Sequence, residues 1–349
     1  MKRAGSAMMW ILGLGFVSAA HATDACSPVA ITTKANVSVS DGTSYKTATH
    51  YHSASSSAFE QIDDDGSSLI VVEGPVAWAR SGDKIVRGSE FHKLFAFGHQ
   101  YHAFILYFDE IMANVEEVES FAFRGETFRA RSGDYPYGGK AHMVMGDGIL
   151  PRGFQFDFPE IPPITVVLSN WKKKRGVDLP YALLIDDGTR QFDYKYTDVK
   201  IKSRLPLWFY DEIASPGFDD VEIYRVHRKL LAAHCLGDAD MIADLSLEET
   251  IVASRGEVLF APREQTRERF IGLFDALNYT AYTDLITPQI EVAESGDIGW
   301  ITVQVRAEGN VVGSERTFDD QWAWVMMIKK QDGEWRHAGN ASNRKEKSK

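Results

Sequence analysis

An aspartate and a histidine near the C-terminal end of the sequence are residue types that acid–base chemistry uses. Asp320 and His337 lie within FDDQWAWVMMIKKQDGEWRHAGNAS, residues 318–342. A histidine beside a carboxylate titrates near neutral pH, as a general acid or base must. In the other interpretation, Asp320 pairs with Arg306 or Arg316 and His337 is a rim residue. We favour this second interpretation and keep the acid–base pair as the alternative.

Aromatic residues of the same stretch suit the wall of an apolar pocket. Gln331-Asp332-Gly333 is a turn signal between two strand patterns, so the stretch predicts a β-hairpin. Because side chains alternate between the faces of a strand, Trp322 and Trp324 share a face with Asp320. Such a tryptophan pair lines a pocket or belongs to an ordinary core. The predicted ligand-binding residues are Trp300, Trp322, Trp324, Tyr279, Tyr282, Thr302 and Gln304. Thr302 and Gln304 are placed with Trp300, as hydrogen-bonding groups of this pocket.

Two histidines are the only candidate metal ligands. His99 and His102 lie three residues apart in an apolar segment, residues 90–112, that predicts one helix interrupted at Gly98. Two imidazoles and a nearby carboxylate are a ligand set that zinc accepts. The sequence has no HExxH or comparable pattern, however. We therefore interpret these histidines as locally hydrogen-bonded and predict neither a metal nor a cofactor.

Composition and the N-terminal residues predict an exported globular protein. The chain has 349 residues, a net charge of −11 and 44% hydrophobic residues, which predicts a soluble protein of about two domains. An acidic balance argues against nucleic acid as a partner. Lys2, Arg3, an apolar run over residues 8–17 and Ala20-His21-Ala22 form the pattern of a cleavable signal peptide, residues 1–22. The run is too short to span a bilayer, and we predict no integral membrane segment.

The two cysteines bear on localisation. Cys26 follows Thr23-Asp24-Ala25, which lacks the pattern of a bacterial lipoprotein signal, so we predict no lipid anchor. The predicted location is the periplasm of a Gram-negative host, or the exterior. Cys26 and Cys235 are too few for a disulfide framework. Because Cys235 lies in an apolar helical pattern, we interpret it as a small core residue, with a single bridge as the alternative.

The N-terminal half predicts a β-rich domain. Residues 23–68 are polar and serine-rich and predict a leader or linker with an edge strand, and residues 69–215 predict the domain itself. ITVVLSNWKKKRG, LPYALLIDDG and RQFDYKYTDVKI have turns at regular intervals, which is typical of an antiparallel meander. Together with the apolar helix they predict a half-barrel whose mouth the helix covers. Over residues 69–201 this order resembles the periplasmic lipoprotein-carrier half-barrels, and the resemblance implies a concave face that holds acyl chains.

The C-terminal third predicts a second domain, residues 219–343, after a boundary at residues 211–217 and before a basic tail, residues 344–349. Asp219 or Asp220 caps a predicted helix over residues 221–236. The elements that follow are helices over residues 239–245 and 263–277, a strand over residues 250–254 and a curved antiparallel sheet. HRKLLAAHCLGDADMIADL and WAWVMMIKKQDGEWRHAGNAS in this order resemble the nuclear transport factor 2-like superfamily, which includes the SnoaL-like cyclases and ketosteroid isomerases. The resemblance implies a cone-shaped domain with one apolar pocket and homodimerisation through its sheet. The fold class is therefore α+β.

The catalytic residues of ketosteroid isomerase do not map onto this chain. That enzyme uses an aspartate base, a tyrosine and a protonated aspartate. Leu230 stands where the tyrosine is expected, and Val252-Ala253-Ser254-Arg255 offers no carboxylate for the base. Our first hypothesis is therefore a protein that binds a hydrophobic small molecule or lipid. The alternatives are an isomerase- or cyclase-type enzyme that uses Asp320 and His337, and an assembly protein whose second domain only dimerises.

Overall fold

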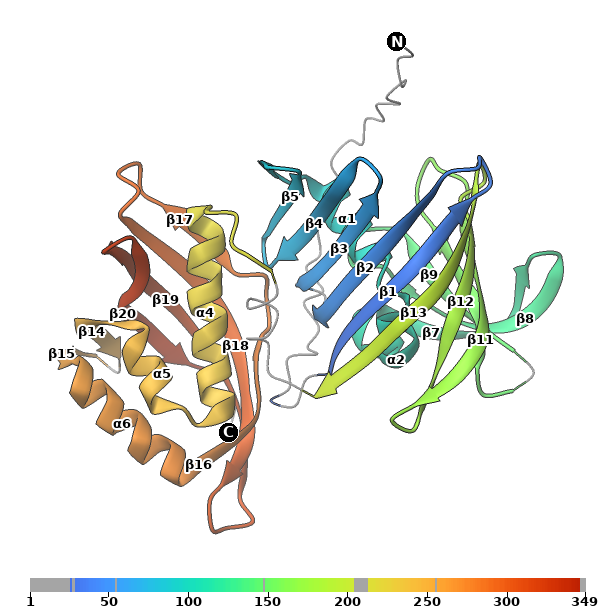
Figure 1. Cartoon of the computed structure of the whole chain (residues 1–349). Helices are drawn as coiled ribbons and strands as arrows, with labels where there is room; N and C mark the ends of the chain where they lie inside the picture. Colours follow the sequence, from blue (N-terminus) through green and yellow to red (C-terminus); the bar gives the residue numbers. More distant parts are fainter. Residues whose placement is uncertain are drawn as a thin grey trace.

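Two curved sheets of different size lie side by side in the molecule (Figure 1). The structure, a computed structural model, describes residue 26 and residues 29–53, 55–146, 148–203, 213–254 and 256–345. The predicted signal peptide and part of the predicted domain boundary lie outside these residues. Antiparallel strands dominate and helices are few, so the predicted α+β class is confirmed. Among the described residues, no helix combines the length and the apolar character needed to cross a membrane.

The larger sheet has thirteen strands, and consecutive strands pair antiparallel along most of it. Its order is β6-β5-β4-β3-β2-β1-β13-β12-β11-β10-β9-β8-β7, so β1 and β13 meet at the centre and the two ends do not pair. The strands are β1 Val29–Val39, β2 Ser44–Ser53, β3 Ser56–Asp63, β4 Gly66–Glu73, β5 Val76–Ser81, β6 Lys84–Arg87, β7 Ala113–Phe123, β8 Glu126–Asp134, β9 Lys140–Met145, β10 Pro151–Asp157, β11 Ile164–Lys174, β12 Val177–Asp186 and β13 Gln191–Ser203.

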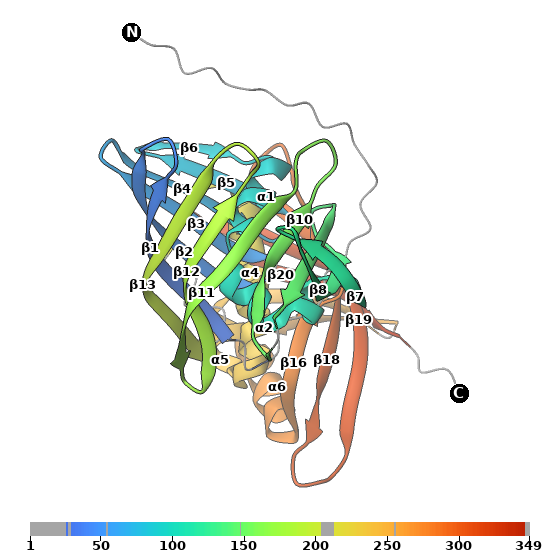
Figure 2. The same ribbon diagram turned by 90° about the vertical axis from the view of Figure 1, so that its right-hand side faces the viewer.

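Two helices, α1 (Glu90–Gly98) and α2 (Tyr101–Ile111), lie in the concave side of this sheet (Figure 2). The core between helices and sheet is rich in aromatic residues, among them Phe97, Phe104 and Phe154, which are fully buried. The sequence predicted a single helix over residues 90–112. The chain instead breaks after Gly98, and Gln100 begins a second helix, which lets the apolar segment follow the curvature of the sheet.

The prediction that residues 23–68 are a leader or linker is wrong for the described part of that segment. β1, β2 and β3 are ordinary strands of the large sheet, and β1 is near its centre. Several of their buried residues are polar. Thr33 and Thr49 are hardly exposed, and their hydroxyl oxygens lie 2.6 Å apart across β1 and β2. The predicted meander of β11, β12 and β13 is present as expected.

The smaller sheet belongs to the C-terminal domain. Its order is β15-β14-β20-β19-β18-β16, with β17 also paired to β18, and only β14 and β20 pair in parallel. Three helices, α4, α5 and α6, lie over one side of it (Figure 1). The elements are α4 Asp219–Leu236, α5 Ala239–Asp244, β14 Ser246–Ser254, β15 Glu257–Pro262, α6 Arg263–Ala276, β16 Leu277–Asp284, β17 Gln289–Val292, β18 Ile298–Val311, β19 Thr317–Gln331 and β20 Glu334–Arg344.

The C-terminal hairpin follows the sequence pattern closely. Asp332 and Gly333 both have positive φ, as a two-residue turn between twisted strands requires. Two details differ from the prediction. Phe218, and neither Asp219 nor Asp220, is the N-cap of α4. Arg344, expected in the basic tail, ends β20 and pairs with Asp320.

A buried ion pair joins the two domains. Arg225 of α4 donates to both carboxylate oxygens of Glu73 of β4, with both distances 2.7 Å. Trp78 Nε1 donates to the same carboxylate over 3.1 Å. Glu73 is completely buried, so these contacts replace the water that its charge would otherwise bind. Nearer the surface, Arg87 of β6 pairs with Asp220 of α4.

Candidate functional site

A cavity of about 760 Å³ opens at the mouth of the half-barrel, between α1, α2 and the concave face of the large sheet. This volume lies within the range of sites that hold drug-sized or larger ligands. Aromatic side chains from both helices and from several strands make up much of its wall. They include Phe91, Phe95, Tyr101, Phe156, Phe192 and Tyr194.

The spacing of residues in α1 explains how the helix faces the cavity. Phe91, Leu94, Phe95 and Gly98 recur at positions i, i+3, i+4 and i+7, which lie on one helical stripe, and all four line the cavity. Phe91 is 63% exposed, although it is large and apolar. An apolar side chain left in water beside an apolar hollow is typical of a ligand site.

Tyrosine hydroxyls supply polar groups in this wall. Tyr101, Tyr135 and Tyr194 are nearly buried, and burial raises the pKa of each well above its ordinary value. These phenols therefore stay neutral at physiological pH and retain a proton to donate. His99 also lines the cavity, and burial lowers its pKa to about 4, so this ring is neutral as well.

The two candidate metal ligands do not share a helical face, because His99 ends α1 and His102 begins α2. His99 Nδ1 bonds to the carbonyl oxygen of Phe95 at 2.7 Å, and His102 Nε2 to that of Pro180 at 2.9 Å. Each ring is therefore hydrogen-bonded to a different backbone carbonyl. In the described part of the chain, no His, Cys, Asp and Glu side chains gather in a group of three or more that would hold a metal ion.

The predicted pair of Asp320 and His337 does not form. Their strands are neighbours, but His337 stands opposite Ile328 in the β19–β20 register. Asp320 is eight residues further along β19, which is roughly 26 Å away at about 3.3 Å per residue. Asp320 instead lies 3.5 Å from Arg344. His337 is 3.4 Å from the hydroxyl of Ser246, and burial lowers its pKa to about 4, so this ring is neutral near physiological pH.

Only some of the predicted ligand-binding residues share a face. Trp322 and Trp324 lie on the side of β19 that faces the helices, partly buried against the core of Ile301, Val303 and Val305. Trp300, Thr302 and Gln304 pair with Met327, Val325 and Ala323 and so take the opposite, outer face. The prediction that Trp300 lines the same pocket is therefore wrong. Trp300 stands opposite Met327, which is three residues from Trp324 and so lies on the other face of β19.

The remaining aromatic candidates gather beneath α4. The ring of His234 stacks on that of Tyr282, with 4.2 Å between the ring centres, and meets the ring of Tyr279 edge to face, with 5.6 Å between the centres. Tyr282 in turn is 6.5 Å from Trp324. A second, more open hollow of about 620 Å³ is bordered by Trp324, Thr302 and the β14–β15 hairpin. Because Thr302 and Trp324 lie on opposite faces of neighbouring inner strands, their side chains do not line one enclosed pocket.

Two hydrogen-bonded histidines escaped sequence analysis. His227 Nε2 lies 2.8 Å from an oxygen of Asp284, and its ring is fully buried under α4. His142 lies 2.7 Å from the hydroxyl of Ser132 and 3.0 Å from Asp157. The second set has the residue types of a nucleophilic triad, but Ser132 is 2% exposed, which keeps a substrate from its hydroxyl. No sequence spacing links these residues, since adjacent strands and distant elements bring them together.

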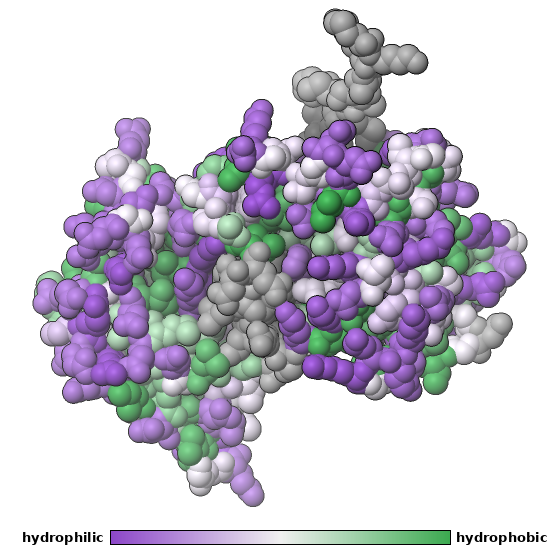
Figure 3. All heavy atoms as spheres, viewed as in Figure 1, coloured by the Kyte–Doolittle hydropathy of each residue, from purple (hydrophilic) through white to green (hydrophobic). Residues whose placement is uncertain are grey.

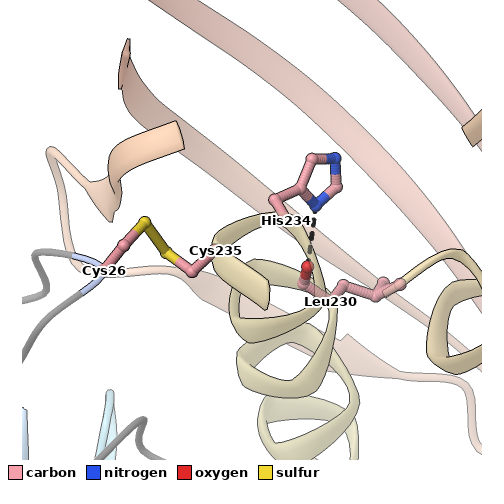
Figure 4. Close-up of a disulfide and its surroundings, with 4 residues drawn as sticks. All are labelled: Cys26, Leu230, His234 and Cys235. Atoms are coloured by element: carbon pink, nitrogen blue, oxygen red, sulfur yellow. Dashed lines mark hydrogen bonds between the residues drawn. A yellow bond between two sulfur atoms is a disulfide. The ribbon is translucent and has the colours of Figure 1, made fainter. Parts of the chain in front are cut away.

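The two cysteines form a disulfide, which the sequence left open (Figure 4). Cys235 lies in the last turn of α4, and Cys26 precedes β1, so the bond spans 209 residues of chain. The backbone amide of Cys26 also donates to the carbonyl oxygen of Thr280 in β16. Interpreting Cys235 as a free core residue was therefore wrong. The helical apolar pattern was real, but the last turn of α4 meets the N-terminal segment there.

No protein-family model matches the sequence, and no curated protein matches it. Among solved structures, a nuclear transport factor 2-like protein from Cytophaga hutchinsonii matches 35% of this chain and 93% of its own, with 18% identity and a TM-score of 0.30. A ketosteroid isomerase-like protein from Erwinia carotovora atroseptica matches 37% and 98%, with 11% identity and a TM-score of 0.32. A LolA superfamily protein from Nitrosomonas europaea matches 54% and 92%, with 13% identity and a TM-score of 0.41. Both resemblances stated from the sequence are thus found again among known structures.

Proposed function

We propose that this chain is an exported protein that binds a hydrophobic small molecule or lipid in the cavity of its half-barrel. The observation that carries the proposal is the aromatic-lined hollow of about 760 Å³ beneath α1, with Phe91 left 63% exposed at its edge. Burial of a hydrocarbon chain there removes apolar surface from water at both partners, which stabilises a complex by about 25 cal/mol per Å². The separation of Asp320 from His337 leaves the isomerase or cyclase alternative without its acid–base pair.

Export is supported by the N-terminal pattern and by the disulfide. The first 22 residues have the charged, apolar and small-residue regions of a signal peptide. Disulfides persist in oxidising compartments such as the bacterial periplasm and are rare in the cytosol of mesophiles. The bond between Cys26 and Cys235 therefore agrees with a mature protein that acts outside the cytosol.

A cavity-filling variant tests the binding site. A side chain at Gly98 enters the space beside Tyr135, because a Cβ there meets the tyrosine oxygen at an ordinary 3.6 Å. We expect Gly98→Leu to weaken binding of a neutral naphthylamine dye at least tenfold, measured by fluorescence titration of the mature protein. Gly272→Leu is the matched control, because Gly272 lies in α6, far along the chain, with open space around it. Equal dye affinity in the two variants would contradict the proposed site.

The ligand itself is accessible to a direct measurement. Native mass spectrometry of protein purified from its own host should show a mass excess that denaturation releases, and Gly98→Leu should carry less of it. A chain that carries no adduct and binds no dye would overturn the proposed function. The same spectrum gives the number of subunits.

We also propose that a second copy of the chain covers the outer face of the small sheet. Ile251, Gly339, Met327 and Trp300 form one row across β14, β20, β19 and β18, and its three large side chains are 36–43% exposed. A row of apolar residues on a monomer surface is typical of an interface. We expect a dimer in analytical ultracentrifugation and a monomer for Met327→Lys. Ile149→Lys, at a site 93% exposed on the other domain, should leave the dimer intact. A monomer at all concentrations would exclude this interface.

A further inference from the structure

The mouth of the half-barrel cavity is strongly acidic. Among its lining side chains are four carboxylates, those of Asp63, Asp64, Asp65 and Asp187, against a single guanidinium, that of Arg190. Carboxylates around a cleft with apolar walls focus their field into it, because the protein screens charge less than water does. The charge at this mouth therefore bears on which ligands enter.

Local hydrogen bonds hold two of these carboxylates in place, those of Asp63 and Asp187. In the β3–β4 turn, an oxygen of Asp63 accepts from the backbone amide of Asp65 at 3.1 Å. In the β12–β13 turn, one oxygen of Asp187 accepts from the amides of Thr189 and Arg190, at 2.9 and 2.7 Å. Both turns are fixed by their own Asx bonds, so these two carboxylates keep their positions at the entrance.

Arg190, the one cation among the described residues that line the cavity, is already engaged. The guanidinium of Arg190 lies over the ring of Phe192, 5.0 Å from its centre, and 3.8 Å from Asp187. An anionic head group would have to compete with both contacts. The entrance therefore offers little attraction to a phosphate or carboxylate.

A buried hydroxyl in the cavity wall provides a second recognition element. Tyr135 lines the cavity and is 3% exposed, and its hydroxyl oxygen has no hydrogen-bond partner within the described chain. A buried polar group without a partner is unfavourable, so an acceptor from a ligand would gain by meeting it. Since this phenol keeps its proton, it suits a carbonyl oxygen.

We propose that the cavity binds acyl amphiphiles whose polar end carries an ammonium group, with the acyl carbonyl accepting a hydrogen bond from Tyr135 and the ammonium lying among the carboxylates of residues 63–65. The proposal rests on the proposed function and specifies its ligand class. The chain enters the aromatic hollow, the carbonyl lies at the wall near Gly98, and the charged end stays at the wet entrance. Amphiphiles that end in a phosphate or carboxylate are disfavoured by repulsion from the same turns.

Three probes of equal chain length separate the two recognition elements. Decanoylcholine has an ammonium and a carbonyl, decyltrimethylammonium has only the ammonium, and decanoylglycine has a carbonyl and a carboxylate. Each displaces the naphthylamine dye below its micellar concentration, in buffer of low ionic strength. We expect decanoylcholine to bind roughly tenfold tighter than decanoylglycine, because each of the exposed carboxylates favours the ammonium and repels the carboxylate modestly. The gap should close in about 1 M salt, where the Debye length is about 3 Å.

Variants assign the effects to residues. Replacing Asp63, Asp64 and Asp65 by asparagine should bring decanoylcholine and decanoylglycine to within about twofold of each other. The matched control replaces Asp178, Asp193 and Asp198 by asparagine. These acidic residues of the same domain lie outside the cavity, so the difference in affinity between the two probes should stay unchanged. Tyr135→Phe should remove the severalfold advantage of decanoylcholine over decyltrimethylammonium without changing the binding of the latter.

The outcomes distinguish this inference from the function on which it rests. Equal binding of all three probes by the natural sequence, or tighter binding of decanoylglycine, overturns the ammonium preference while the apolar site stands. A gap that survives the triple asparagine variant also overturns it. Dye binding that is absent, or indifferent to Gly98→Leu, overturns the proposed function instead.

Discussion

Glu73 and Arg225 illustrate how much a single residue pair can determine in this molecule. The carboxylate is completely buried and the guanidinium is almost so, and each comes from a different domain. Two charges removed from water stabilise the structure only as long as both are present. Trp78, which donates to the same carboxylate, fixes its orientation from a neighbouring strand.

Removing one partner of this pair should be costly. Glu73→Ala leaves a buried guanidinium without its counter-charge, and we expect the free energy of unfolding to fall by about 3–5 kcal/mol. Urea denaturation followed by circular dichroism measures this loss. Asp319→Ala, which breaks the exposed bidentate pair with Arg306, is the comparison and should cost about 1 kcal/mol or less. Losses of similar size in both variants would contradict this account of the domain contact.

Four histidines predict how stability depends on pH. Burial lowers the pKa of His99, His102, His234 and His337 from 6.5 to about 4 in the folded protein. Between these values the unfolded chain binds more protons, so the free energy of unfolding should fall as pH falls from about 6.5 to 4. Each histidine contributes a slope of about 1.4 kcal/mol per pH unit. His234→Phe, which keeps a ring beside Tyr282, should reduce the slope by one such contribution.

Urea titrations at several pH values compare the two slopes. The difference between natural sequence and variant isolates the histidine from the carboxylates, which titrate in both. Identical slopes would show that His234 is already protonated in the folded protein or neutral in the unfolded chain.

The site residues show where sequence analysis reached its limit. Face alternation placed Trp322 and Trp324 together correctly, because that rule acts within one strand. Pairing Asp320 with His337 overlooked the register that the predicted Asp332-Gly333 turn sets, since counting outward from Gln331 and Glu334 places His337 opposite Ile328. The cavity itself combines residues from α1, from the β3–β4 and β12–β13 turns and from strands far apart in the sequence, so only the folded sheet reveals it.

At the scale of elements, the sequence predicted best where apolar periodicity is strong. The C-terminal hairpin, α4 and the β11–β13 meander follow such patterns. The sequence predicted only an edge strand in this segment, and β2 and β3 were missed, because the residues they bury include serines and threonines such as Ser57 and Thr49. Buried polar residues interrupt the apolar alternation by which a strand is recognised.

Close approach of two strands makes a further prediction. β20 runs parallel to β14, and a Cβ on Gly339 would lie 2.4 Å from the carbonyl oxygen of Ile251. Because backbone cannot move aside as a side chain can, Gly339→Ala should lower the free energy of unfolding by about 1–3 kcal/mol. Gly272→Ala, in open space within α6, should instead raise it by about 0.5–1 kcal/mol, as alanine favours helix. Thermal unfolding of the two variants in parallel measures the sign of each change in the free energy of unfolding. A change of the same sign in both variants would exclude this explanation.

The two domains of the molecule are joined at three places. The buried Glu73–Arg225 pair and the surface Arg87–Asp220 pair connect β4 and β6 to α4, and the disulfide fastens the segment before β1 to the other end of that helix. α4 is therefore the element through which the domains meet. The face of the molecule shown in Figure 3 is mostly hydrophilic, with smaller groups of hydrophobic residues between the hydrophilic ones.

The disulfide makes the final prediction, because it closes a loop of 209 residues that contains the entire half-barrel. Cross-linking distant positions restricts the unfolded chain, and long loops gain most in the chain-entropy account, so replacing both cysteines by serine should lower the free energy of unfolding by about 2–5 kcal/mol. The natural protein in reductant should then unfold like the double variant, whereas reductant should leave the variant itself unchanged. Equal stability of the oxidised protein and the variant would mean that the unfolded chain is already compact around this bond. Dye binding at the cavity should survive in the folded variant, since neither cysteine lines it.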